Sequence, residues 1–282
     1  MRYLALCLAL LLPAAAPAYA QTQADAPAPA ATPSDAAADA PSSGLRDFCA
    51  DRPGRATPPC ILDAGHIQVE TALDDAVFQH NDGAHATLST YGATEVRFGI
   101  TSTLEAEVAW APLVVDHERG ASDRTGVGDL SVGFRAALLP PSGDGPQVAL
   151  QAFVSAPTAT HGLGAGGWAG GARLPISAPL GKSLSFGMTP EVDVVRNADG
   201  GGTHEALIDA VSLSHAFGKL TLGVEAWGAF DDDPSHQTYQ ATADLTAALM
   251  IDDNLQLDAG GNFGLNRATP NAEIYVGISR RF

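Results

Sequence analysis

The sequence predicts an all-β fold: a transmembrane antiparallel up-and-down β-barrel of about twelve strands, closed by the C-terminal strand. Three observations predict it: a two-residue alternation of apolar and polar side chains, apolar segments of about ten residues, and short turns that alternate with long links. After the N-terminal leader, no segment approaches the roughly 20 consecutive apolar residues that a membrane helix needs. If this chain enters a membrane, it therefore crosses with strands.

Residues 1–20 have the pattern of a secretory signal peptide. Arg2 precedes an apolar run over residues 4–12, and small residues lead to the cleavage pattern of residues 18–20. We therefore expect an exported protein whose mature chain begins at Gln21.

Two short regions precede the predicted barrel. Residues 21–45 consist mostly of Ala, Pro, Asp and Ser, and they can bury too little apolar surface to offset their ordering entropy, so we expect a disordered linker. Residues 46–64 contain Cys49 and Cys60, separated by Pro and Gly, and in an oxidising compartment this spacing favours a local disulfide loop. The alternative, a redox or metal site, has neither a Cys-x-x-Cys spacing nor a neighbouring histidine to support it.

The barrel is expected over residues 65–282. The predicted strands are 65–74, 90–99, 103–112, 128–139, 147–156, 169–178, 183–194, 206–216, 219–230, 238–250, 254–265 and 272–282. Short turns alternate with long links, and the long links are expected at 75–89, 113–127, 157–168, 195–205, 231–237 and 266–271. An even number of strands with long loops on one side only is the arrangement of outer-membrane barrels, and a soluble β-sandwich does not sort its loops in this way.

The two faces of the predicted strands differ in polarity. The strand at 254–265 places Leu255 and Leu257 on one face and Gln256 and Asp258 on the other. Lipid explains the first face and a wet lumen explains the second. Aromatic side chains at the long-link ends of strands form the expected girdle: Trp110, Phe230 and Tyr239.

The last strand, 272–282, alternates in the same way and ends on Phe282. A terminal aromatic residue resembles the signal read by the bacterial barrel-assembly machinery, which we expect as a partner together with outer-membrane lipid. Arg280 departs from this pattern because it occupies a position that is usually apolar, although an arginine at the rim can extend into the headgroups. The expected location is the outer membrane of a Gram-negative bacterium.

Several segments carry a family resemblance. They are Asp51-Arg52-Pro53-Gly54, Gly65-His66-Ile67-Gln68-Val69-Glu70, Thr94-Glu95-Val96-Arg97-Phe98-Gly99-Ile100-Thr101, Gly126-Val127-Gly128-Asp129-Leu130-Ser131-Val132-Gly133-Phe134-Arg135, Pro157-Thr158, Asp258-Ala259-Gly260 and Gly264-Leu265-Asn266. With the terminal Phe, this set resembles the outer-membrane barrel family named for the meta-pathway of phenol degradation, from Cys49 to Phe282. The resemblance implies a transport barrel with poorly defined cargo, and it brings no catalytic residues.

The charge of the chain limits its partners. A net charge of -17 argues against binding to nucleic acid and against adsorption to anionic lipid. Alternation places the following charged residues in the lumen: Glu70, Glu95, Arg97, Glu105, Glu107, Asp129, Arg135, Arg173, Glu191, Asp193, Glu225, Asp244, Asp258 and Glu273. One hypothesis is a cation-preferring interior. The other is that these charges pair with one another and fill a narrow barrel, with the 46–64 loop folded inside.

Other kinds of site have weaker support. Six histidines fall in the predicted long links and suggest a metal-gathering vestibule, but none has zinc-site spacing: His80, His85, His117, His161, His204 and His236. Ser214 and His215 point to opposite faces of a strand and cannot form a catalytic pair. We therefore expect no enzymatic activity, no metal and no cofactor.

The function expected from the sequence is passive passage of small solutes across the outer membrane, including the aromatic or hydrophobic compounds that the resemblance implies. The first alternative is a structural or surface-exposed barrel without a through-pore. An outer-membrane barrel hydrolase and a soluble periplasmic β-protein rank below it.

Overall fold

The computed structural model describes residues 44–81, 84–139 and 145–282, and residues 45–282 form one compact unit. The predicted signal peptide and nearly all of the predicted linker lie outside the described residues and stay predictions. No helix in the described part of the chain is long and apolar enough to span a membrane.

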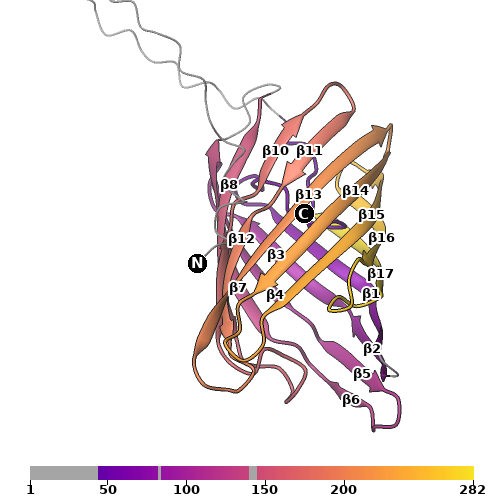
Figure 1. Cartoon of the computed structure of the whole chain (residues 1–282). Helices are drawn as coiled ribbons and strands as arrows, with labels where there is room; N and C mark the ends of the chain where they lie inside the picture. Colours follow the sequence, from indigo (N-terminus) through magenta and orange to yellow (C-terminus); the bar gives the residue numbers. More distant parts are fainter. Residues whose placement is uncertain (1–43, 82–83, 140–144) are drawn as a thin grey trace, which may run out of the picture. The chain divides into compact units, whose positions relative to one another are not determined.

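The regular structure of the described residues consists of β-strand segments (Figure 1). In chain order they are β1 (Ile67–Asn81), β2 (Ala84–Tyr91), β3 (Ala93–Gly99), β4 (Leu104–Trp110), β5 (Leu113–Glu118), β6 (Arg124–Gly126), β7 (Leu130–Leu139), β8 (Gln147–Ala156), β9 (Ala169–Arg173), β10 (Ile176–Pro179), β11 (Leu184–Met188), β12 (Glu191–Arg196), β13 (Thr203–Phe217), β14 (Leu220–Asp231), β15 (Thr238–Asp252), β16 (Leu255–Gly264) and β17 (Ala272–Arg281).

These segments form a closed antiparallel barrel of 12 strands, as predicted. Several strands are interrupted: β4 and β5 continue one another across Pro112, β9 and β10 across Pro175, and β11 and β12 across Pro190. Proline has no backbone N–H to donate, so it interrupts the hydrogen-bonded ladder at these positions. The barrel closes where β1 pairs with β17 on one side and with β3 on the other.

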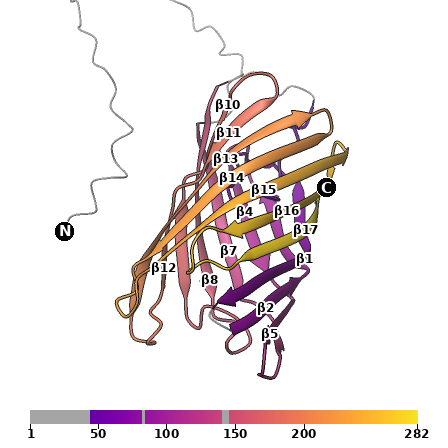
Figure 2. The same ribbon diagram turned by 45° about the vertical axis from the view of Figure 1, so that its right-hand side comes forward.

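The long-link side of the barrel differs from the sequence prediction at two places. The predicted links 75–89 and 113–127 are wrong in large part, because β1 and β2 stay paired as far as Asn81 and Ala84, and β5 pairs with β6. Figures 1 and 2 show β2 and β5 projecting beyond the neighbouring strands. Their sequences are too polar to show an apolar face, but backbone pairing does not require one.

The outer face of the barrel is apolar. Large side chains on successive strands are exposed, among them Phe134 (57%), Val224 (52%) and Leu245 (56%). A protein surrounded by water rarely exposes a continuous apolar band of this kind, whereas lipid favours it. The girdle residues Trp110 and Tyr239 are exposed as well. An apolar outer face around a polar interior is the arrangement of a barrel that spans a membrane.

The interior of the barrel is polar. Its most deeply buried large side chains include Arg97, Arg135, Glu70 and Glu105, each of which is at most 2% exposed. Residues 46–64, called the plug from here on, lie in this interior and contact inward-facing side chains of the wall. The plug enters at the short-turn end, where the Arg46 guanidinium donates to the Ser102 carbonyl at 2.7 Å.

Candidate functional site: the plugged lumen

The plug is a disulfide loop held by arginines of the barrel wall. The Cys49–Cys60 disulfide predicted from the sequence is present. Arg97 of β3 donates to the Cys49 carbonyl at 3.0 Å and to the Cys60 carbonyl at 3.1 Å. Arg135 of β7 donates to the Cys60 carbonyl at 3.3 Å. The wall therefore binds both ends of the loop through main-chain oxygens, which any sequence supplies, so alternation alone could not reveal these contacts.

Arg97 is also the centre of a buried ion network. Its guanidinium lies 3.1 Å from a Glu70 carboxylate oxygen and 2.9 Å from one of Glu105. It lies 3.4 Å from Asp51 of the plug. Buried charges are tolerated when they are paired and hydrogen-bonded, and this cluster meets both conditions.

Arg135 joins the plug to the same wall. It forms a salt bridge with Asp51 and lies 2.8 Å from a Glu107 carboxylate oxygen. Burial alone raises the pKa of Asp51, but Arg135 and Arg97 outweigh burial and lower this pKa to about 2. Asp51 therefore stays ionised while the plug is seated. Its backbone N–H also donates to Glu70 at 2.9 Å.

Two plug arginines bind the opposite side of the wall. Arg52 forms a salt bridge of 3.0 Å with Asp258 of β16. The backbone N–H of Arg55 donates to Glu225 of β14 at 2.7 Å, and its side chain pairs with Glu273 of β17. Carboxylates that alternation predicted as lumen lining are therefore the binding partners of the plug.

A third contact region completes the ring around the plug. Thr189, in the link between β11 and β12, donates its hydroxyl to the Thr57 carbonyl at 3.1 Å. Arg173 of β9 lies 3.4 Å from the Thr57 hydroxyl and forms a salt bridge of 3.0 Å with Glu191. The plug is thus bound from most of the circumference of the barrel rather than from one strand.

Glycines mark where the plug approaches the wall. A Cβ on Gly99 would lie 2.1 Å from the Asp63 carbonyl oxygen, so only glycine lets the plug backbone come this close. A Cβ on Gly277 would lie 2.4 Å from Nε of Arg52, which is a flexible side chain and could move.

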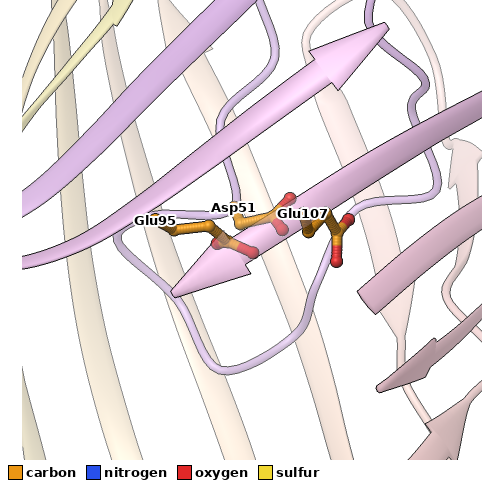
Figure 3. Close-up of side chains that lie close together, drawn as sticks. All are labelled: Asp51, Glu95 and Glu107. Carbon is orange, nitrogen blue, oxygen red and sulfur yellow. The ribbon is translucent and has the colours of Figure 1, made fainter. Parts of the chain in front are cut away.

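Acidic side chains gather where plug and wall meet. Figure 3 shows Asp51 of the plug beside Glu95 of β3 and Glu107 of β4, and one oxygen from each lies within 4.8 Å of the others. In the described part of the chain this is the one group of three or more potential metal ligands, and it contains no histidine. Arg135 already neutralises part of this charge, so the cluster is part of the plug-binding network.

The other predicted lumen residues lie farther from the plug. Asp129 accepts hydrogen bonds from the backbone N–H groups of Ala159 at 2.9 Å and Ala165 at 2.8 Å, so it fixes the 157–168 link. Asp193 lies against Gly171 of the neighbouring β9. These two carboxylates organise the wall on the long-link side.

Open space remains on the long-link side of the plug. A cavity of about 330 Å³ is lined by Arg52 of the plug and by wall residues that include Glu95, Asp75 and Asp129. This volume is within the range of small-molecule sites. A solute entering from the long-link side would therefore meet an acidic pocket whose floor is the plug.

Ser214 and His215 do not form a pair, and the described loop histidines make separate local contacts: His80 with His85, His117 with Asp123, and His204 with Asp231. The His215 ring packs 4.4 Å from Phe217, while Ser214 occupies the next position and faces the other side of β13. His117 is hydrogen-bonded to Asp123 at 2.6 Å in an exposed hairpin.

Residues 50–282 match the model of the protein family described as "Putative MetA-pathway of phenol degradation". The chain belongs to this family. The match covers the plug from its fifth residue onward and the whole barrel, and it confirms the resemblance drawn from the sequence motifs. No curated protein matches the sequence.

The fold is similar to those of solved outer-membrane proteins. An outer membrane channel from Pseudomonas putida F1 matches with a TM-score of 0.64 and 14% identity, over 82% of this chain and 99% of that one. The β domain of a Bordetella autotransporter, BrkA, matches with a TM-score of 0.50 and 13% identity, over 78% of this chain and all (100%) of that one. At these identities the likeness shows the fold alone.

Proposed function

We propose that the protein is an outer-membrane channel for passive passage of small solutes, and that the plug is its removable gate. One observation carries the proposal: a segment separate from the wall fills a polar lumen, and it is held mainly by hydrogen bonds and ion pairs. A gate must leave its site at moderate cost, and contacts of this type can be exchanged for water.

The plug contributes little apolar surface to the interior. Among its described residues, only Ile61 and Leu62 are buried large hydrophobic side chains. Burial of one such side chain stabilises by roughly 1.5–3 kcal/mol, so the apolar part of the plug contact is small beside that of a folded core. Removal of the plug would hydrate charged groups rather than expose a hydrophobic core.

The charge of the lumen favours some solutes over others. Carboxylates outnumber guanidinium groups on the wall, and neutralising Arg52 and Arg55 belong to the plug. An opened lumen therefore attracts cations, admits neutral molecules and repels anions.

The class of solute follows from this field together with the family. The family description names phenol degradation, and an uncharged phenol-type aromatic is compatible with an acidic passage. We propose neutral aromatic compounds as cargo, with aromatic carboxylates excluded by charge. The names of the related solved structures describe a channel and an autotransporter domain rather than enzymes, in keeping with a transport role.

The alternative is a barrel without a through-pore. It is favoured by the same plug, which occupies the lumen and contacts the wall on several sides. The two proposals differ in whether the plug ever leaves.

The test is conductance in planar bilayers, with the reversal potential taken under a salt gradient. The full mature chain is compared with a variant lacking residues 46–64, and a variant lacking residues 21–43 is the control for N-terminal shortening. We expect rare openings from the full chain and from the control, and steady cation-selective openings after removal of the plug. Correct folding is checked by heat-modifiable migration in gels.

The outcomes separate the two proposals. A folded full chain that shows no openings, together with a plug-deleted barrel that conducts, would mean that the plug does not leave, which supports the barrel without a through-pore. If the plug-deleted barrel is folded and silent, the channel proposal is wrong. Uptake into liposomes of a neutral phenol analogue but not of its carboxylate would support the proposed solute class.

A further inference from the structure

One histidine is enclosed where two long links meet at the mouth of the barrel. His204 is the second residue of β13, and its side chain is 6% exposed. The two links are residues 197–202, between β12 and β13, and residues 232–237, between β14 and β15. His204 contacts Asn197 of the first link, Asp233 of the second and Asp231 at the end of β14, and these four residues are called the His204 cluster from here on.

Both ring nitrogens of His204 face oxygen atoms. The Nδ1 atom lies 2.9 Å from Oδ1 of Asn197 and 3.6 Å from a carboxylate oxygen of Asp233. The Nε2 atom lies 2.9 Å from a carboxylate oxygen of Asp231, at an angle that makes this contact an ion pair rather than a hydrogen bond. The Asn197 oxygen is an acceptor here, because the nitrogen of the same amide donates to the Gly201 carbonyl.

This arrangement favours the doubly protonated ring. A neutral imidazole has one N–H group and one lone pair, whereas the imidazolium has an N–H group on each nitrogen. In the neutral form one nitrogen of His204 would turn its lone pair toward an oxygen atom, and burial keeps water from replacing that contact. The carboxylates of Asp231 and Asp233 add to the preference, because nearby negative charge favours a protonated histidine.

Asp233 connects the ring to the backbone of both links. One of its carboxylate oxygens accepts a hydrogen bond from the Ala198 N–H at 2.7 Å, and the other accepts from the Ser235 hydroxyl at 2.6 Å and the Ser235 N–H at 2.7 Å. The hydroxyl of Ser235, followed by these N–H groups, lowers the pKa of Asp233 below its ordinary value. Asp233 therefore stays ionised at neutral pH, where a histidine can change its charge.

We propose that His204 is a proton-sensitive switch that holds the two long links together at the mouth of the barrel. The protonated ring joins residues 197–202 to residues 232–237. When the proton leaves, one ring nitrogen is left facing an oxygen atom without a hydrogen between them, and the links separate more readily. The contacts favour the charged ring, so their contribution is complete at low pH and is lost as the pH rises. The proposal does not depend on whether the barrel conducts.

Other charged groups lie near His204 on the neighbouring strands. Val195 of β12 is the cross-strand neighbour of His204, and Asp193, two residues before Val195, faces the same side of the wall. Arg196 and Glu205 occupy adjacent positions in their strands and face the opposite side. Asp193 is therefore the further acid whose titration has to be separated from that of His204.

The experiment measures the mobility of a nitroxide label on Ala198→Cys, an exposed position in the 197–202 link, by electron paramagnetic resonance. It uses the refolded mature chain in detergent between pH 5 and pH 9. Cys49 and Cys60 are joined in the disulfide, so the label attaches to the new cysteine alone. We expect an ordered label at low pH and a ratio of mobile to ordered label that rises roughly 10–100-fold across one step, as loss of a charged hydrogen bond predicts.

Variants assign the step to one ring. His204→Ala should give a mobile label at every pH, with no step. His236→Ala removes an exposed histidine of the 232–237 link and should leave the step unchanged, as should Asp193→Asn. In nitrogen NMR of histidine-labelled protein, the signal that His204→Ala removes should change from imidazolium to neutral imidazole over the same pH interval.

Three results would overturn the proposal. One is a folded, heat-modifiable parent whose label has the same mobility from pH 5 to pH 9. Another is a step that persists in His204→Ala or that disappears in Asp193→Asn. A third is a His204 ring that loses its proton at a pH where the label does not change. If His204→Ala does not fold, Asp231→Asn decides, because removing this carboxylate should move the step about 1 pH unit lower, and an unmoved step would contradict the proposal.

Discussion

Replacement of Arg135 by methionine should open the channel. Arg135 is fully buried and contacts Asp51 of the plug together with Glu105 and Glu107 of the wall. Methionine keeps much of the volume but leaves these carboxylates without this guanidinium. The seated plug shields them from water, so the barrel can hydrate them only by releasing the plug.

The size of the effect follows from the cost of breaking a buried ion pair, which is about 3–5 kcal/mol. Each 1.4 kcal/mol is a factor of ten, so the ratio of released to seated plug should rise roughly 100-fold to 4,000-fold. The assay is the open fraction in single-channel recordings, with protease cleavage within residues 46–64 as an independent measure of plug release.

Arg119→Met is the matched control, because Arg119 is exposed in the turn between β5 and β6 and removing it changes the net charge equally. A folded Arg135→Met barrel with the open fraction and protease resistance of the parent would refute the reasoning. It would mean that Arg97 alone suffices to hold the plug.

Three further predictions test other parts of the structure. Cys49→Ser with Cys60→Ser should raise the open fraction, because a disulfide of this kind stabilises its closed loop by about 2–4 kcal/mol; reduction of the parent should reproduce the effect in bilayer recordings. The pKa of Asp51 is lowered to about 2 in the seated plug, so the contribution of Asp51 to plug seating is complete above its ordinary pKa of 3.8 and is lost as the pH falls toward 2. Openings should therefore increase between pH 3.8 and pH 2. An Asp51→Asn variant should lack this pH-dependent increase. Val224→Lys places a charge on the lipid face and should destabilise the barrel by roughly 2–4 kcal/mol in urea titrations, whereas Ala121→Lys in the exposed turn between β5 and β6 should not.

The barrel could be predicted from the sequence because its pattern is local. Alternation of side chains is visible within ten residues, and the strands predicted at 147–156 and 272–282 match β8 and β17 closely. The hairpin extensions beyond the neighbouring strands could not be predicted in this way. There β1, β2 and β5 have polar residues on both faces, and only the backbone pairing defines them.

The seating of the plug depends on contacts that no local pattern shows. Arg52 meets Asp258 across 206 residues, and the Arg55 backbone meets Glu225 across 170. Two signals were nevertheless present in the sequence. The wall has more predicted inward acids than bases, and the missing cations, Arg52 and Arg55, stand in the disulfide loop. Gly99 also lies at an inward position of β3, where lack of a side chain is explained only once the plug backbone lies against it.

The luminal acids therefore act in opposite ways in the closed and the open barrel. In the closed barrel Asp258 binds Arg52, so Asp258→Asn should weaken plug seating and raise the open fraction of the full chain. Once residues 46–64 are removed, the same carboxylate serves only as part of the cation-attracting field, so Asp258→Asn should lower cation selectivity in reversal-potential measurements. If Asp258 only set ion selectivity and did not bind the plug, Asp258→Asn would lower cation selectivity without raising the open fraction of the full chain. If the barrel never conducts, neither the full chain nor the plug-deleted barrel would show a current. Opposite effects of one substitution in the two backgrounds are expected only if the acidic wall both holds the gate and lines the passage.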